Sequence, residues 1–271
     1  MDHYAVFGNP IAHSKSPLIH SLFAQQTQQA MDYQSILAPI GGFFQAAKAF
    51  FQQGGKGANV TVPFKFDAYD LVQQYSHRAQ TARAVNTIKL LENGEFFGDN
   101  TDGAGLVRDI KENHNLQLKD KTVLVLGAGG AVSGIIQPLL EEAPQSILIA
   151  NRTVEKAQNL LNRFDSSIID ACGFNDERLT TSFDIVINGT AASLHGENVA
   201  VPSKSIKNAF CYDMMYGAEP TTFMLWANTN GAKQCCDGLG MLVEQAAEAF
   251  FIWRHVRPET QSVIQQLRSQ L

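Results

Sequence analysis

The segment of this chain that most constrains its fold is residues 122–131, where a strand-like run leads directly into a glycine-rich turn. The run TVLVL has the β-branched and aliphatic composition of a strand buried on both faces. Gly127 permits a sharp turn directly after it, and Gly129 lets a phosphate group approach the backbone. The residues that follow have a helical pattern, and the N–H groups at the start of that helix would favour a bound anion. This order of strand, glycine turn and helix predicts an α/β unit that binds a dinucleotide.

The predicted phosphate-binding turn comprises Gly127, Ala128, Gly129, Gly130 and Ala131. Val132 occupies the position at which such turns usually carry a third glycine, so we expect the helix and the strand to pack somewhat differently there. A plain glycine turn without a ligand is one alternative interpretation. A nucleotide site of the methyltransferase type is another, and the end of the next strand helps to distinguish it.

The end of the second predicted strand of this unit, Ser146–Ala150, indicates which dinucleotide fits. Enzymes that use NAD typically hold the ribose diol with an Asp or Glu about 20 residues after the glycines. Here the candidate residues are Asn151, Arg152, Thr153 and Lys156. A guanidinium and an ammonium would bind a 2′-phosphate, and no carboxylate at the strand end repels it. Glu155 is expected in the first helical turn, where it stabilises the helix N-terminus. We therefore predict NADP rather than NAD.

Apolar segments alternate with helical patterns along almost the whole chain, which is typical of an α/β protein with parallel sheets. Strands are expected at His3–Gly8, Asp32–Ala38, Gly57–Val62, Thr122–Leu126, Ser146–Ala150, Ser167–Ala171, Asp184–Asn188 and Ala209–Asp213. Helices are expected at Leu18–Gln28, Gly42–Gln53 and Gly103–Asn113, and from the glycine turn to about Glu142. Ala84–Leu91 and Glu95–Gly98 should form a hairpin, because Asn93-Gly94 suits a tight turn with positive φ.

The length of 271 residues suits two modest domains. We expect a substrate domain of residues 1–102 plus about 239–271, and a cofactor domain of residues 103–238 that carries the glycine turn. The first domain is discontinuous in this prediction, because the C-terminal residues carry an apolar helical stripe that would pack back on it. That stripe comprises Leu239, Leu242, Val243, Ala246, Ala247, Phe250 and Trp253.

Composition argues against several classes of function. Charged residues make up 17% of the chain and are scattered, with a net charge of -5, so we expect no nucleic-acid partner and no membrane surface. No apolar run approaches the ~18 residues that cross a bilayer, and the first residues lack the pattern of a secretory signal. The four cysteines are Cys172, Cys211, Cys235 and Cys236. Their spacing suits no metal site, and we expect reduced thiols in a cytoplasmic protein.

Two short motifs upstream of the glycine turn carry the predicted chemistry. NVTVPFK ends at Lys65, after a predicted strand and turn, and DNTDG places Asp102 before a predicted helix. Near a nicotinamide, desolvation would favour the neutral amine of Lys65, whereas Asp102 would favour its ammonium form. Such an amine suits the transfer of a proton to a developing alkoxide and its retrieval in reverse. Alternatively, Lys65 is a solvated surface lysine, and Asp102 caps the helix that begins at Gly103.

Hydroxyl and amide side chains accompany this pair. Ser14 and Ser16 come just before a predicted helix, where hydroxyls and free N–H groups would bind a carboxylate. An ordinary N-cap with Pro17 at the first helical position is the alternative. The remaining polar positions are Asn59, Thr61, Asn86 and Thr101. An apolar substrate would leave such groups unpaired at ~1–3 kcal/mol each, so we predict a small polyhydroxylated acid as substrate.

Over essentially its whole length the chain resembles the shikimate dehydrogenases of the bacterial biosynthetic type. The motifs that carry the resemblance are GNPIAHSKSP, ANVTVPFK, AVNTI, GDNTDG, VLGAGGA, ANRT, YDMMYG and DGLGMLVEQAA. The resemblance implies reversible reduction of 3-dehydroshikimate to shikimate with NADPH, a step toward aromatic amino acids. It also implies an α/β substrate domain and a Rossmann-type NADP-binding domain, with the C-terminal helices returning to the first.

The same resemblance implies a role for each candidate residue. Ser14 and Ser16 would hold the substrate carboxylate, and Lys65 would be the acid–base residue, paired with Asp102. The substrate hydroxyls would be contacted by Thr61, Asn86, Asp102, Tyr216 and Gln245. The pyrophosphate would lie on Gly127–Ala131, the adenosine phosphate on Asn151, Arg152, Thr153 and Lys156, and the nicotinamide beside Met214 and Gly238.

Two positions depart from the family pattern. Arg83 stands where many members have Gly, and His77, which we expect to be a surface residue, stands where the family often has an acidic residue near the cofactor. The nearest rival function is a broader relative that also oxidises quinate, often with NAD. A cofactor-binding sensor without turnover is a second rival, but it would need neither Lys65 nor Asp102. Because the family includes monomers and dimers, we expect either a monomer or a homodimer.

Overall fold

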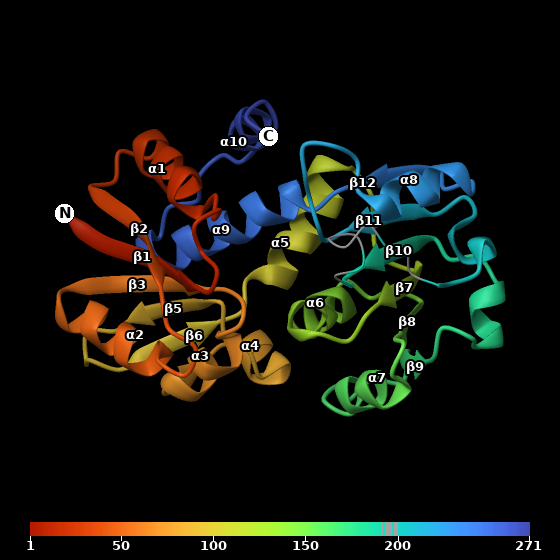
Figure 1. Cartoon of the computed structure of the whole chain (residues 1–271), viewed down its shortest axis with the longest axis horizontal. Coiled ribbons are helices and arrows are strands. Elements are labelled where there is room, and N and C mark those ends of the chain that lie inside the picture. Colours follow the sequence, from red (N-terminus) through yellow and green to blue (C-terminus); the bar gives the residue numbers. More distant parts are fainter. Residues whose placement is uncertain (191, 193–196, 198–199) are drawn as a thin grey trace. The chain divides into compact units, whose positions relative to one another are not determined.

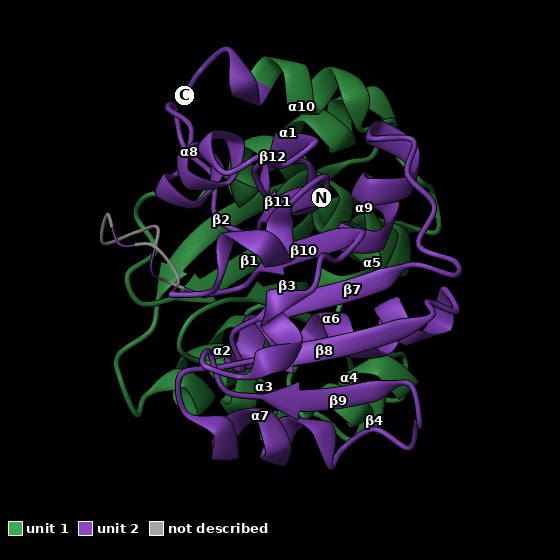
Figure 2. Cartoon of the chain, turned by 90° about the vertical axis from the view of Figure 1, so that its right-hand side faces the viewer, with its two compact units in different colours: residues 1–105, 242–266 green, residues 106–241, 267–271 purple. Residues whose placement is uncertain are grey.

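The chain divides into two compact units. A computed structural model describes residues 1–190, 192, 197 and 200–271 (Figure 1). The first unit comprises Met1–Gly105 and Leu242–Gln266, and the second comprises Leu106–Met241 and Leu267–Leu271 (Figure 2, green and purple). Each unit is built on one six-stranded sheet.

The sheet of the first unit has the strand order β2-β1-β3-β5-β6-β4. Its strands are β1 (Asp2–Gly8), β2 (Met31–Leu37), β3 (Gly55–Val60), β4 (Gln74–Tyr75), β5 (Thr87–Leu90) and β6 (Phe96–Asp99). β1 pairs in parallel with β2 and β3, whereas β5 pairs antiparallel with both β3 and β6. The hairpin predicted around Asn93-Gly94 is therefore confirmed, with a φ of 84° at Gly94, and it makes this sheet mixed.

The helices of the N-terminal part are α1 (Ser16–Gln26), α2 (Phe43–Gln52), α3 (Lys65–Leu71) and α4 (His77–Ala82). The first two were predicted, whereas α3 and α4 were not, because helices of 7 and 6 residues give no clear periodic signal. Aromatic rings fill the core next to α3: Phe7 meets Phe43 edge-on, and Phe43 stacks on Phe64 at 5.4 Å. This packing fixes Phe64, the residue directly before Lys65.

The sheet of the second unit has the order β12-β11-β10-β7-β8-β9, and all its pairs are parallel. Its strands are β7 (Thr122–Leu126), β8 (Ser146–Ala150), β9 (Ile169–Cys172), β10 (Ile185–Asn188), β11 (Phe210–Asp213) and β12 (Gln234–Cys236). Counted from β7, this is the order 3-2-1-4-5-6 of a Rossmann fold, read from the other edge. The predicted strands of this unit are confirmed, and β12 was missed as an element.

The helices of the second unit are α6 (Gly130–Glu141), α7 (Val154–Leu161) and α8 (Thr222–Thr229), with short 3-10 turns at Glu177–Thr180 and Ser203–Ile206. α5 (Asp102–Arg108) leads into this unit and continues as a π-helix over Asp109–Asn113. The helix predicted over Gly103–Asn113 is thus present, but its second half is wound differently. Tyr212 Oη donates to the buried Asp109 carboxylate at 2.6 Å, which anchors this π turn to β11.

The C-terminal helices α9 (Leu239–Arg254) and α10 (Gln261–Arg268) complete the chain, and residues 242–266 belong to the first unit. Trp253 of α9 donates from Nε1 to the carbonyl oxygen of Ile88 at 3.0 Å and packs on Tyr4, with ring centroids 4.7 Å apart. The expectation that these helices return to the first unit is confirmed. Across the described residues, no helix has both the length and the apolar character to span a bilayer.

Candidate functional site

Lys65 is the first residue of α3. β3 ends at Val60, a turn closed by Phe64 N–H and the carbonyl oxygen of Thr61 follows, and the helix begins directly after it. The side chain of Lys65 is only 17% exposed, and its ammonium group pairs with the Asp102 carboxylate. The interpretation of Lys65 as a solvated surface lysine is therefore wrong. The pairing holds the amine at the carboxyl end of β3, where functional groups of parallel sheets commonly gather.

Asp102 is the first residue of α5, and its side chain is 10% exposed. One carboxylate oxygen accepts from Lys65 Nζ, and the other accepts from Asn86 Nδ2 at 2.7 Å. Its own backbone N–H donates to Asn100 Oδ1 at 3.2 Å. A carboxylate in the first turn also favours the helix N-terminus, so the alternative role of Asp102 at the helix start coexists with the ion pair.

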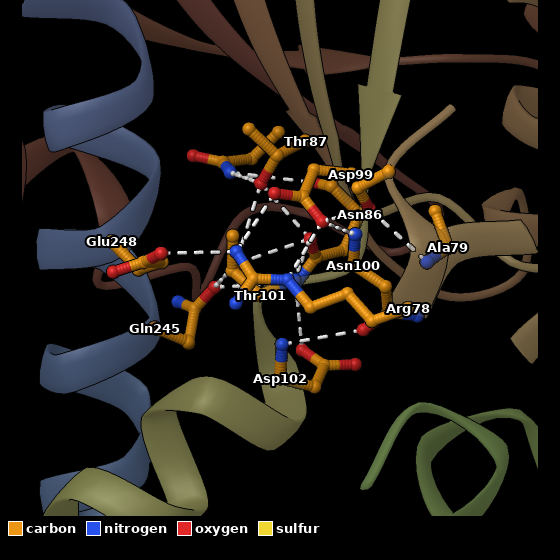
Figure 3. A network of polar contacts seen from close by, with 12 residues as sticks. Arg78, Ala79, Asn86, Thr87, Asp99, Asn100, Thr101, Asp102, Gln245 and Glu248 are labelled. Carbon is orange, nitrogen blue, oxygen red and sulfur yellow. Dashed lines mark hydrogen bonds and ion pairs between the residues drawn. The ribbon is translucent and has the colours of Figure 1, made fainter. Parts of the chain in front are cut away.

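Asn86 is the centre of the polar network shown in Figure 3. Its Oδ1 accepts from the backbone N–H of Thr101 at 2.9 Å and from Thr87 Oγ1 at 2.9 Å. Its Nδ2 donates to Asp102 and lies 3.4 Å from Gln245 Oε1. Asn86 is 3% exposed and Thr101 is fully buried. The network fixes the orientation of the Asn86 amide, because reversing it would break both accepted bonds.

The strand ends beside Lys65 carry the other hydroxyl candidates of this unit. Thr61 follows β3, and its backbone N–H donates to the carbonyl oxygen of Phe7 in β1 at 2.9 Å. Ser14 lies in the loop after β1, and its Oγ accepts from the N–H of Ser16, the buried first residue of α1, at 3.3 Å. The cap position is Lys15, which makes no side-chain cap bond, so the alternative of an ordinary serine N-cap with Pro17 at the first helical position is wrong.

The glycine turn of the second unit lies at the switch point of its sheet, between β7 and β10. Gly127 has a φ of 107°, in the left-handed region that favours glycine. A Cβ atom on Gly127 would also lie 3.2 Å from the backbone of Gly189, which follows β10. α6 begins at Gly130, and Gly129 at its N-cap faces open space, because a Cβ atom there would have no described atom outside its own neighbours within 4 Å. A helix N-terminus that begins next to the open space at Gly129 fits a phosphate group.

Gly189, in the loop after β10, leaves room for the side chain of Val132, which stands where such turns usually carry a third glycine. Val132 is fully buried, and its Cγ2 would overlap a Cβ atom placed on Gly189. The chain thus places glycine opposite the valine side chain. Gly238 is similarly constrained, because a Cβ atom there would overlap the carbonyl oxygen of Met214. Met214 and Gly238 are therefore neighbours.

The residues proposed for the 2′-phosphate follow β8, the neighbour of β7. Leu126 and Ala150 are register partners, so the glycine turn and Asn151 leave the sheet at the same edge. Asn151 Nδ2 donates to the carbonyl oxygen of Thr153 at 2.8 Å and shapes this loop. Arg152, Thr153 and Lys156 are all exposed. Glu155 is in the first turn of α7, as expected.

Two further residues singled out in the sequence are Tyr216 and His77. Tyr216 follows β11 and is half-buried, and burial together with the nearby Asp237 carboxylate raises its pKa. His77 is exposed at the start of α4, as expected of a surface histidine. The described residues contain no group of three or more His, Cys, Asp or Glu side chains that could hold a metal.

The sequence did not reveal the buried ionic residues next to the polar network. Asp99, in the DNTDG motif, binds Arg78 of α4, which also binds Glu248 of α9. Nothing local in the sequence pairs these residues. The DNTDG motif was the one local sign of this ion pair. It places the acidic Asp99 at a strand end, beside Asn100 and close to Asp102, where its carboxylate would need a cationic partner.

A Rossmann unit with a glycine turn at its switch point, together with a buried amine–carboxylate pair, defines the class of dinucleotide-dependent oxidoreductases. Comparison with protein families agrees. Residues 6–88 match the shikimate dehydrogenase substrate binding domain, residues 109–211 match shikimate / quinate 5-dehydrogenase, and residues 238–268 match the shikimate 5'-dehydrogenase C-terminal domain. The chain belongs to the shikimate dehydrogenase family.

Individual relatives are similar over the full chain. The shikimate dehydrogenase (NADP(+)) of Hahella chejuensis is 53% identical over 270 residues, covering 99% of both chains. The crystal structure of an Ael1 enzyme from Pseudomonas putida is 45% identical, with a TM-score of 0.94 and 98% of both chains covered. The shikimate 5-dehydrogenase of Thermus thermophilus, solved with NADP(H) and shikimate, is 28% identical, with a TM-score of 0.88 and 100% of both chains covered.

Proposed function

We propose that the protein catalyses the reversible NADPH-dependent reduction of 3-dehydroshikimate to shikimate, in the pathway to aromatic amino acids. The observation that carries this proposal is the buried pair of Lys65 and Asp102, surrounded by amide and hydroxyl groups in the first unit. A cofactor-binding sensor would need no such pair. The names of the full-length relatives support the choice of substrate and cofactor.

In this proposal the first unit positions the substrate and moves the proton. The hydroxyls of Ser14 and Ser16 hold the substrate carboxylate near the start of α1, where backbone N–H groups favour an anion. Amide groups of Asn86 and Gln245 and the hydroxyl of Thr61 contact the ring hydroxyls. Tyr216, from the second unit, is a further proposed contact.

Lys65 donates the proton in the direction of reduction. Its ammonium group gives a proton to the substrate carbonyl oxygen while the carbonyl carbon gains a hydride, so an O–H and a C–H bond form together. The nicotinamide supplies that hydride when NADPH is bound. Asp102 keeps the amine in place through its ion pair and accepts from a substrate hydroxyl. In the direction of oxidation, the neutral amine takes the same proton back.

The second unit fits NADPH. The turn Gly127–Ala131 holds the pyrophosphate against the N-terminus of α6, since Gly129 at the helix N-cap leaves open space through which the phosphate can approach. Arg152 and Lys156, with Asn151 and Thr153, bind the 2′-phosphate by charge and hydrogen bonds. Met214 and Gly238 flank the nicotinamide.

A steady-state assay at the NADPH absorbance band tests the proposed function. Shikimate and quinate are offered separately, each with NADP and with NAD. We expect rapid NADPH formation from shikimate with NADP, and values of kcat/KM at least about 100-fold lower for the other three combinations, because the site has polar groups for each substrate hydroxyl and a cationic site for the 2′-phosphate. Comparable rates with quinate and NAD would favour the broader relative, and NADPH binding without turnover would favour the sensor.

We also propose that the protein acts in the cytoplasm on small molecules, as a monomer or homodimer, with no nucleic-acid or membrane partner. The net charge of -5 and the four free thiols support this proposal. Light scattering of the purified protein at several concentrations distinguishes the two oligomeric states, and loss of activity on reducing the protein would contradict the role of the cysteines as thiols.

A further inference from the structure

Arg78 of α4 connects two segments that carry residues of the polar network (Figure 3). Its Nε and Nη2 donate to the two carboxylate oxygens of Asp99, at 2.8 and 2.7 Å. The same Nη2 donates to Glu248 Oε1 at 3.0 Å. The side chain of Arg78 is 21% exposed, and those of Asp99 and Glu248 are 5% and 19% exposed. Arg78 thus bridges the end of β6 and helix α9 in a setting largely shielded from water.

Asp99 begins the loop that ends in Asp102. Its Oδ1 also accepts from the Asn100 N–H at 2.7 Å and from Ser76 Oγ. Asn100 is fully buried; its Nδ2 donates to the carbonyl oxygen of Ala84 at 3.0 Å, and its Oδ1 accepts from the Asp102 N–H. Hydrogen bonds therefore run without interruption from Arg78 through Asp99 and Asn100 to the backbone of Asp102.

Glu248 lies about one turn of α9 beyond Gln245, whose Oε1 is 3.3 Å from Thr101 Oγ1. Arg257 binds the other oxygen of the Glu248 carboxylate at 2.5 Å. The four side chains form a row of alternating charge, Arg257–Glu248–Arg78–Asp99. Within this row only Arg78 contacts both carboxylates, so Arg78 is the member that ties α9 to the loop.

We propose that Arg78 is a positioning residue that sets the distance between the Asp99–Asp102 loop and α9, so that Asp102, Asn86 and Gln245 face the same bound ring. This inference rests on the proposed function for its ligand, a cyclic polyhydroxy acid. Two parallel N–H donors on a planar guanidinium match the Asp99 carboxylate, while the spare hydrogen of Nη2 reaches Glu248. A lysine at position 78 supplies one charge but not this fixed fork.

The test compares Arg78→Lys with Arg257→Lys, because both change a partner of Glu248 but only Arg78 also binds Asp99. For Arg78→Lys we expect kcat/KM for shikimate to fall by up to about 100-fold, since displacements near 1 Å at a reacting site have effects of this size. The dissociation constant of NADPH should not change. Arg257→Lys should leave both quantities unchanged. Equal effects of the two variants, or an equal loss of NADPH binding in Arg78→Lys, would overturn the proposal.

Hydrogen exchange separates this proposal from the proposed function. In the unliganded protein, Arg78→Lys should speed amide exchange in residues 99–102 and 242–248 and leave the second-unit sheet unchanged. If the variant shows this pattern while the wild type does not turn over shikimate, the proposed substrate is overturned but the positioning role is not. Active wild-type protein without any exchange change in Arg78→Lys would overturn the positioning role.

A double-mutant cycle gives a third readout. If Arg78 acts through the orientation of Gln245, the effects of Arg78→Lys and Gln245→Ala on kcat/KM should sum to more than the effect of the double variant. Full additivity would contradict the proposed route. Because Arg78→Lys keeps a cation next to Asp99, the variant avoids an unpaired buried carboxylate and should fold.

Discussion

The ammonium group of Lys65 and the carboxylate of Asp102 form a mostly buried ion pair that joins the first residue of α3 to the first residue of α5. Breaking such a pair by removing one partner leaves a charge without compensation, so both partners are constrained to stay together. The second carboxylate oxygen is held by Asn86, which prevents Asp102 from turning away from the lysine. The amine is therefore fixed in position before any ligand binds, as a proton donor requires.

The substitution Asp102→Asn tests the part that this carboxylate plays. The amide side chain would keep the volume but lose the charge, and it cannot accept from both Lys65 and Asn86. We expect kcat/KM for shikimate to fall by about 10²–10³-fold, with changes in both kcat and KM. Asp67→Asn, which changes an acidic residue in the first turn of α3, serves as the control and should be nearly silent. Steady-state kinetics check both variants, and wild-type kcat/KM in the first would remove Asp102 from the mechanism.

Replacing Arg152 tests cofactor selectivity. Arg152→Ala should raise KM for NADPH by about 10- to 100-fold, because a charge-assisted hydrogen bond to the 2′-phosphate contributes about 1.5–3 kcal/mol. KM for NADH should change little, since NADH lacks that phosphate. Arg152→Lys keeps the charge and should show an intermediate effect. Kinetics with both cofactors decide the matter, and equal increases for the two would reject the assigned role.

His20 should make stability depend on pH. Its ring is fully buried and stacks on Tyr33 at 4.3 Å, and neither nitrogen has a hydrogen-bond partner within the described part of the chain. Burial lowers the pKa of His20 from 6.5 to about 3, an effect that the nearby Asn59 side chain only partly offsets. At pH values between about 3 and 6.5, His20 is therefore protonated in the unfolded chain but neutral in the folded protein. The free energy of unfolding should therefore fall as pH drops below 6.5, with a contribution approaching about 1.4 kcal/mol per pH unit.

Chemical denaturation of His20→Leu between about pH 7.5 and pH 5, a range that spans the ordinary pKa of histidine, measures that contribution. In the variant, the free energy of unfolding should depend less steeply on pH, because the contribution of His20 is gone. Its stability relative to wild type should therefore improve as pH falls. Phe23→Leu removes a buried ring that packs on His20 and should keep the wild-type slope. Parallel curves for wild type and His20→Leu would show that His20 does not titrate as described.

Arg83 should be replaceable by glycine with a gain in stability. It ends α4 in the left-handed conformation, with a φ of 50° and a ψ of 37°. Arg83→Gly should raise the free energy of unfolding by about 0.5–1 kcal/mol, because relief of the left-handed strain exceeds the added entropy of the unfolded chain. Gln80→Gly, inside the same helix, should lower it by a similar amount. Thermal unfolding measures whether each variant is more or less stable than wild type. A lower stability of Arg83→Gly would contradict the conclusion that the left-handed backbone of Arg83 is strained.

Local patterns predicted strands β7 to β11 and helix α6 of the second unit because these elements contain their own signals, whereas β12 and α8 were not predicted. The apolar run of β7 and the glycines after it form a strand, turn and helix whatever lies elsewhere in the chain. The same sequence could not show how Val132 is tolerated, since the compensating residue is Gly189, which lies after β10. Val132 and Gly189 come together only because β7 and β10 are neighbours in the folded sheet.

In the first unit the sequence located the functional groups but not their supports. Lys65, Asp102 and Asn86 stand in short polar motifs that could be recognised directly. Arg78 and Glu248 could not be recognised, because they are 170 positions apart and are joined only through the fold. The two-residue strand β4 and the short helix α3 were missed for a related reason, as segments of this length are stabilised by tertiary packing rather than by their own periodicity.

The most direct test of the mechanism is the turnover of Lys65→Met, which keeps a long apolar side chain and removes the amine. Single-turnover and steady-state rates are measured with shikimate and NADP, together with the dissociation constant of each ligand. We predict a fall in kcat of about 10²–10⁴-fold, a smaller change in KM for shikimate and unaltered NADP binding. A kcat close to that of the wild type, with both ligands bound normally, would contradict the assignment of Lys65 as the acid–base residue.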